Sequence, residues 1–170
     1  GSQGGRRGQP GAGDRPQQAD GRGSDGESPP EGDQGALHAL GLATGDRVGT
    51  LAWNTRHHLE TYYATMGAGL VCHTLNPRFT VQHLATIIDE ADDRVLAVAA
   101  SLWPLLCELL PLCPRVEHVV ILDEPLPGDA ALPGSTARLW SHESPLDALG
   151  TPVTSGDFDE DAPAGLCYTS

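Results

Sequence analysis

Between residues 45 and 122, short runs of apolar residues alternate with segments in which apolar residues recur at helical spacing. The segments predict three helices that begin near Thr55, Thr80 and Ser101, since each of these side chains can cap a helix N-terminus. Strands that alternate with helices are typical of a doubly wound α/β fold with a mostly parallel sheet. The apolar runs predict four strands, at 48–53, 70–75, 94–99 and 118–122.

Both ends of the chain depart from this pattern. Residues 1–35 contain no Leu, Ile, Val, Phe, Trp or Tyr. They have nothing to bury, so we expect a disordered or non-native low-complexity segment there and a folded part at 36–170. Residues 123–161 are rich in Pro, Gly, Asp and Ser, which predicts a long surface connection with an apolar patch around Leu139–Trp140. Residues 165–169 then read as one more buried strand.

Charge and cysteine usage limit the partners and the compartment. The formal net charge is −13, and all 10 basic residues are arginine. An acidic surface repels a phosphate backbone, so we expect no nucleic-acid partner. The most apolar stretch, 102–112, is interrupted by two prolines and a glutamate and is too short for a transmembrane segment, which needs about 20 residues. Four cysteines without CxxC spacing, and no signal-peptide pattern, predict a cytoplasmic location.

The last strand runs into two small hydroxyl residues, Thr169 and Ser170. A strand that leads into hydroxyl and glycine residues suits a phosphate site, because backbone N–H groups of the following turn can point at one anion. An ordinary buried strand end is the competing interpretation, since the signal is only a few residues long.

Other candidate chemistry has a plainer explanation beside it. Four histidines lie close in sequence without metal-ligand spacing, so we expect structural roles for His57, His58, His73 and His83. The thiols of Cys107 and Cys113 are expected to be buried and unreactive. The acidic run at 157–161 lacks the spacing of a calcium loop and is expected to face solvent. The aromatic residues of the first strand–helix junction can line a ligand pocket or belong to the core: Trp53, Tyr62 and Tyr63.

Four stretches together resemble the amino-terminal part of AMP-forming acyl-CoA synthetases, in the adenylate-forming ligase superfamily. They are GDRVGTLAWNTRHHLETYYATMGAGLVCHTLNPRFT, IIDEADDRVLAV, VEHVVILD and FDEDAPAGLCYTS. The resemblance is strongest to medium- and long-chain fatty-acyl-CoA ligases and methylmercaptopropionate-CoA ligases. It covers residues 36–170, and its most specific pieces are 45–78 and the terminal LCYTS.

The resemblance implies a two-step reaction. A carboxylic acid attacks ATP to form an acyl adenylate, and coenzyme A then displaces AMP. It matches Thr169 and Ser170 to the first hydroxyls of the phosphate-binding loop, with Thr169 also beside Mg²⁺. It places the rest of that loop, the nucleotide pocket and a catalytic lysine beyond Ser170. We therefore expect an inactive fragment of an ATP-dependent ligase.

Two functions of other classes compete with the ligase. A non-catalytic α/β module could bind a partner through an exposed sheet edge. A dinucleotide-binding fold is disfavoured, because WNTRHH stands where a GxGxxG motif would follow the first strand. The resemblance leaves the oligomeric state open, with a homodimer of the intact enzyme as one option.

Overall fold

The fold is a doubly wound α/β sheet, seen in a computed structural model that describes residues 1, 31–125, 129–141, 159 and 161–168. The α-helices are α1 Glu31–Ala39, α2 Arg56–Gly67, α3 Val81–Ala91 and α4 Trp103–Leu109, and short 3₁₀ turns, Ala100–Leu102 and Leu110–Leu112, flank α4. The strands are β1 Arg47–Leu51, β2 Val71–Leu75, β3 Val95–Val98, β4 His118–Ile121, β5 Arg138–Ser141 and β6 Gly165–Cys167.

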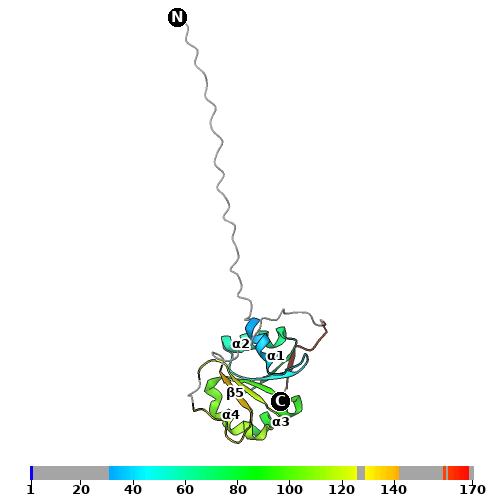
Figure 1. Ribbon diagram of the computed structural model, residues 1–170, viewed down its shortest axis with the longest axis vertical. Coiled ribbons are helices and arrows are strands. Elements are labelled where there is room, and N and C mark those ends of the chain that lie inside the picture. Colours follow the sequence, from blue (N-terminus) through cyan, green and yellow to red (C-terminus); the bar gives the residue numbers. More distant parts are fainter. Residues whose placement is uncertain (2–30, 126–128, 142–158, 160, 169–170) are drawn as a thin grey trace.

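Within the described residues the strands form one sheet in the order β5-β4-β3-β1-β2-β6. Every neighbouring pair is parallel. Helices α1 and α2 cover one face of the sheet, and α3 and α4 cover the other (Figure 1). The chain moves from β1 to β2, returns past β1 to β3, and continues outward to β5. The predicted doubly wound, mostly parallel fold is confirmed.

Two of the three predicted caps begin helices, whereas the cap expected at Ser101 is wrong: α4 begins at Trp103, after a 3₁₀ turn, and no side chain caps it. The hydroxyl of Thr55 accepts a hydrogen bond from the backbone N–H of His58, and that of Thr80 accepts one from His83. Each cap satisfies one of the backbone donors that a helix N-terminus leaves without an intrahelical partner. Helix α3 ends at Asp92, whose left-handed conformation (φ 56°) closes the helix.

Burial follows the position of each strand in the sheet. Every residue of β3 is buried, and so are the last four residues of β1 and the last three of β4. The edge strands β5 and β6 are only partly covered. Continuous apolar strands at the centre are expected where helices cover both faces of a parallel sheet. The apolar stripe of α3 completes the core on one side, with Leu84, Ile87, Ile88 and Ala91 buried.

Three further features differ from the sequence prediction: the start of the first helix, the connection at 123–161, and the strand expected to be buried at 165–169, which is a three-residue edge strand with Gly165 and Cys167 exposed. Helix α1 begins at Glu31, so its first turn lies inside the segment expected to be disordered. It extends to the buried residues Ala36 and Leu37, which anchor the polar turn to the core. Strand β5 lies in the stretch predicted to be a surface connection, because Leu139 and Trp140 pair with β4. Residues 2–30 lie outside the described part of the chain.

Candidate functional site

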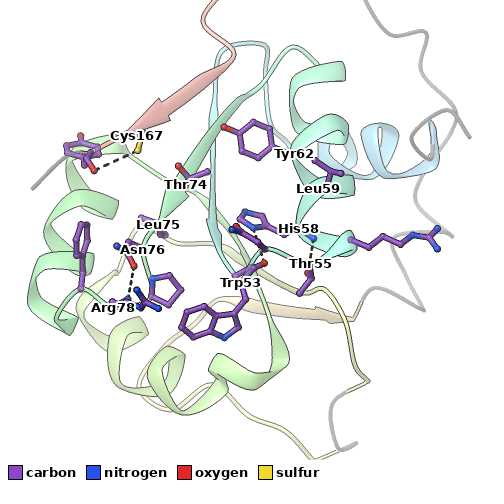
Figure 2. A pocket seen from close by; sticks show the side chains of 16 residues that line it. Trp53, Thr55, His58, Leu59, Tyr62, Thr74, Leu75, Asn76, Arg78 and Cys167 are labelled. Atoms are coloured by element: carbon purple, nitrogen blue, oxygen red, sulfur yellow. Dashed lines mark hydrogen bonds between the residues drawn. The ribbon is translucent and has the colours of Figure 1, made fainter. Parts of the chain in front are cut away.

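A pocket of about 900 Å³ opens at the carboxyl ends of β1, β2 and β6 (Figure 2). Ligands of open parallel α/β sheets bind at this edge, where loops leave the strands. Two segments build most of its wall: the exit of β1 with the first turns of α2, and the exit of β2. Strand β6 supplies Cys167, and Tyr168 follows it. The lining residues are Ala52, Trp53, Asn54, Thr55, Arg56, His58, Leu59, Tyr62, Thr74, Leu75, Asn76, Pro77, Arg78, Phe79, Cys167 and Tyr168.

The structure describes the segment that leads to the predicted anion site as far as Tyr168. Strand β6 pairs in parallel with β2, so its carboxyl end meets the pocket at the edge of the sheet. Tyr168 follows the strand and is not part of a helix. Thr169 and Ser170 lie outside the described residues, and their roles toward phosphate and Mg²⁺ stay predictions.

His58 forms part of the pocket wall and binds the exit of β1. Its Nδ1 lies 3.2 Å from the carbonyl oxygen of Trp53, and its Nε2 lies 3.0 Å from Oγ1 of Thr50. A carbonyl only accepts, so Nδ1 carries a proton in this contact, while the hydroxyl of Thr50 lies within hydrogen-bond distance of both Nε2 and the carbonyl oxygen of His73 (3.4 Å). Burial lowers the pKa of His58, against the opposing effect of the Trp53 carbonyl. Burial thus favours the neutral imidazole, and its two contacts hold the β1–α2 junction in place.

The opposite wall is the turn that follows β2. The side-chain oxygen of Asn76 accepts a hydrogen bond from the N–H of Arg78 (3.0 Å), and its carbonyl accepts one from Phe79 (3.0 Å). This is the turn expected of an Asn-Pro pair. The ring of Phe79 stacks on His83 with centroids 4.4 Å apart. The turn thus presents an aromatic ring and a guanidinium at the pocket.

The two arginines of the pocket differ in their ion pairs. Nε of Arg56 lies 2.6 Å from a carboxylate oxygen of Glu60, one helical turn away. Arg78 is exposed and forms no ion pair with any residue that the structure describes. Its charge is available to an anionic ligand.

The aromatic residues of the β1–α2 junction separate into two roles. Trp53 and Tyr62 line the pocket, which is the first of the two roles predicted for these aromatic residues. Tyr63 is 52% exposed on the outer side of α2 and is not part of the lining. None of the three belongs to the buried core.

The histidines and cysteines take structural positions. Among the described residues, no three His, Cys, Asp or Glu side chains are grouped to hold a metal ion. Cys113 is buried, and burial raises its pKa to about 11, whereas Cys107 is only half-buried. Burial also raises the pKa of Cys72 to about 12. Neither of these two buried thiols is poised as a nucleophile.

Sequence reasoning missed a buried hydrogen-bonded pair, His73 and Asp93, between the strands that lead to the pocket. Nδ1 of His73 lies 2.7 Å from a carboxylate oxygen of Asp93, and both side chains are fully buried. His73 lies in the middle of β2 and Asp93 lies just before β3, 20 positions further along the chain. Only the register of the sheet brings them together, so no local pattern could have identified the pair.

A family model described as "AMP-binding enzyme" matches residues 35–170. The chain belongs to this family. The match begins inside α1 and runs through β6, so it includes every strand of the sheet and both walls of the pocket. The resemblance to AMP-forming acyl-CoA synthetases, inferred from the sequence, is confirmed.

Curated relatives of this family member are named as CoA ligases. A 3-methylmercaptopropionyl-CoA ligase of Ruegeria lacuscaerulensis is 43% identical over 137 residues, which is 79% of this chain and 24% of the relative. A medium-chain-fatty-acid–CoA ligase of Ectopseudomonas oleovorans is 35% identical over 136 residues, again 79% of this chain and 24% of the relative. The chain thus spans about a quarter of the length of these relatives.

Solved structures share the fold of this family member. The anthranilate CoA ligase AuaEII, in complex with anthranoyl-AMP, superposes with a TM-score of 0.68 at 19% identity, over 82% of this chain and 26% of that one. The N-terminal domain of FACL13 from Mycobacterium tuberculosis gives a TM-score of 0.58 at 22% identity, over 82% and 32%. Across the residues described here, no helix has the length and apolarity to cross a bilayer.

Proposed function

We propose that this chain is the amino-terminal part of an ATP-dependent ligase that joins a carboxylic acid to coenzyme A through an acyl adenylate. The observation that supports this most directly is the position of β6. Its carboxyl end reaches the pocket beside β2, where a following loop can wrap a phosphate group. Membership of the AMP-binding enzyme family and the names of the relatives agree with this chemistry.

The residues of the pocket suit an anionic, partly apolar ligand. Arg78 offers a positive charge without an ion-pair partner among the described residues, and Trp53 and Phe79 offer aromatic surface. Thr169 and Ser170 would add hydroxyl donors at the start of the phosphate loop. Charge that develops on ATP during adenylate formation is stabilised by donors placed in advance.

Magnesium would neutralise part of the phosphate charge when bound. The lining residues include no carboxylate. The resemblance to acyl-CoA synthetases assigns the ion to Thr169, which would hold it together with ATP oxygens, a type of site that Mg²⁺ commonly occupies.

The acid is proposed to be a medium- or long-chain fatty acid or a methylthio-substituted short acid, as in the names of the relatives. The test is acid-dependent pyrophosphate exchange, measured with octanoate, palmitate and 3-methylmercaptopropionate on the protein expressed from its complete gene. Release of AMP on addition of coenzyme A would establish the second step. Exchange that is absent with all three acids would contradict the proposal.

Substitution of Thr169 links the activity to this chain. Thr169→Val keeps the shape of the side chain and removes the hydroxyl, so the exchange rate should fall by about 10²-fold, the order seen when one transition-state donor is removed. Thr86→Val is the matched control, because Thr86 is an exposed threonine of α3 outside the pocket. Equal exchange rates for the two variants would show that the hydroxyl of Thr169 does not contribute to the reaction.

A cytoplasmic location fits the four cysteines, none of which forms a disulfide. A homodimer and the absence of a nucleic-acid partner stay predictions. The alternative, a non-catalytic module, would bind a partner through the edge strands β5 and β6. It is the weaker interpretation, because the chain belongs to a family of enzymes.

A further inference from the structure

We propose that the buried His73–Asp93 pair is a positioning device that fixes Tyr168, and through it the entrance to the phosphate loop. The inference rests on the proposed function for its catalytic consequence. Its structural part concerns only described residues and stands by itself.

The hydrogen bond between His73 and Asp93 crosses the space above Gly49 of β1, where no side chain is present. Leu96, Gly49, His73 and Leu166 lie in one row across β3, β1, β2 and β6. A Cβ atom on Gly49 would lie 2.6 Å from Leu96 and 2.9 Å from a carboxylate oxygen of Asp93. The glycine therefore leaves the space in which the carboxylate of Asp93, at the start of β3, reaches the imidazole of His73.

Stability alone does not account for this pair. Both side chains are 0% exposed, and two of their polar atoms, Nε2 of His73 and the second carboxylate oxygen of Asp93, have no hydrogen-bond partner. Burial raises the pKa of Asp93, while the hydrogen bond from His73 acts in the opposite direction. Apolar side chains of similar size commonly stabilise a core at least as well as a buried, partly satisfied ion pair. What the pair adds is a fixed orientation of the imidazole ring.

The oriented imidazole contacts Tyr168. The two ring centroids are 5.3 Å apart and the planes are tilted by 52°, within the range of favourable aromatic packing. Strand β6 has three residues and one neighbour, so its ladder holds the strand end weakly. The His73 ring gives Tyr168 a second attachment, to a side chain that Asp93 prevents from rotating.

The first test uses the 170-residue chain and amide hydrogen exchange. The double variant His73→Phe/Asp93→Leu keeps an aromatic ring and an apolar core but loses the hydrogen bond. We expect protection at Leu166, which pairs with His73, to fall by about 10-fold or more, while Val119 and Val120 in β4 stay unchanged. Equal losses in β4 and β6 would assign the pair to general core stability, and unchanged β6 amides would also overturn the proposal.

Single substitutions separate the hydrogen bond from the volume of the side chains. Asp93→Asn keeps an oxygen that accepts the Nδ1 proton of His73, so it should retain β6 protection, whereas Asp93→Ala should lose it. Gly49→Ala should resemble Asp93→Ala, because the new methyl group displaces the carboxylate. His118→Gln is the matched control: it disturbs a histidine–aromatic contact with Trp140 at the opposite sheet edge. It should leave protection at Leu166 unchanged.

The second test uses the complete ligase. Asp93→Ala should raise the KM for ATP by about 10-fold with little change in the KM for the acid, and Asp93→Asn should restore it. If the wild-type protein has no acid-dependent exchange, the proposed function fails while the hydrogen-exchange result still decides the positioning role. Equal changes in both KM values would contradict a role confined to the phosphate loop.

Discussion

Single side chains at helix ends do much to set where the helices of this protein begin. Thr80 is exposed and follows a turn, and its hydroxyl accepts the N–H of His83 at 3.3 Å. The N–H of His83 lies in the first turn of the helix, where no backbone carbonyl of the helix can accept it, so the hydroxyl of Thr80 supplies its acceptor. Helix α3 starts on the pocket side of the sheet, so the cap also fixes the turn that carries Arg78.

Removal of this cap tests its energetic contribution. Thr80→Ala should lower the free energy of unfolding by about 1 kcal/mol, the usual loss for a Thr N-cap. Thr80→Ser retains the acceptor oxygen and should lose only a few tenths of that value. Urea unfolding at 25 °C measures both. Identical midpoints for the two variants would show that the hydroxyl bond contributes nothing.

The thiols should differ sharply in reactivity. Burial raises the pKa of Cys72 to about 12 from its ordinary value of 9.0, while Cys167 is exposed. At pH 8 iodoacetamide should therefore modify Cys167 about 10²-fold faster than Cys72, because the thiolate is the reactive form. Mass spectrometry of timed samples gives the rates. In urea the two rates should converge, and unequal rates there would point to a local sequence effect.

The same shift fixes the direction of a pH effect. Above about pH 9 the unfolded chain loses the Cys72 proton, while the folded chain keeps it up to about pH 12. The folded state then binds more protons than the unfolded state, so stability falls as pH rises through this interval. Cys72→Ala should flatten the decline measured by urea unfolding between pH 8 and pH 10.

At the scale of elements, the edge strand β5 depends on one side-chain bond in addition to its ladder. The indole Nε1–H of Trp140 donates to Nδ1 of His118 in β4, at 3.1 Å. Only an unprotonated Nδ1 accepts this bond. Burial is the main cause of the lowered pKa of His118, so the folded state favours the neutral ring.

Trp140→Phe tests this contact. The variant should lose about 1 kcal/mol at pH 8, the net value of one hydrogen bond. Because the pKa of His118 is lowered in the folded state, the stability that the neutral ring contributes is present above pH 6.5 and declines on acidification. The difference between wild type and variant should therefore shrink at pH 5. Trp103→Phe is the control, since the indole N–H of Trp103 forms no hydrogen bond with any residue that the structure describes, and its backbone bond to Ala100 is kept.

The elements also show what the sequence could and could not predict. Helices α2 and α3 and strands β1 to β4 were evident because each carries a clear apolar period and a cap or turn residue. Strand β5 was not, since four residues between proline- and glycine-rich stretches resemble a loop until β4 supplies a partner. In the site, Trp53 and Tyr62 were foreseeable from their place after a strand. The His73–Asp93 contact was not, because it depends on sheet register.

Across the whole molecule, the two ends of the sheet strands differ. The pocket lies at the carboxyl ends of the strands, and several ion pairs lie at their amino ends. There Arg47 lies 3.5 Å from Asp92, and Arg94 lies 2.8 Å from Glu117. These groups are partly exposed, so each pair contributes little by itself. Their position leaves the pocket edge with Arg78, whose charge the described residues do not neutralise.

At this scale the proposed function predicts the behaviour of the 170 residues by themselves. The chain contains no lysine, while the resemblance assigns the phosphate loop and the catalytic step one lysine each. We expect no acid-dependent release of pyrophosphate above the buffer blank with octanoate, ATP and coenzyme A. The protein from the complete gene is the positive control. Turnover by the 170 residues alone would mean that the chemistry does not require these lysines.

Because glycine has no side chain, position 49 leaves room for the groups at positions 73 and 93, and the three positions are far apart in the sequence. A larger residue there is compatible with the fold only if the groups at 73 and 93 become smaller or move away. Among related proteins these three positions should therefore vary in concert, and a lineage that replaces the glycine should also have abandoned the histidine and the aspartate.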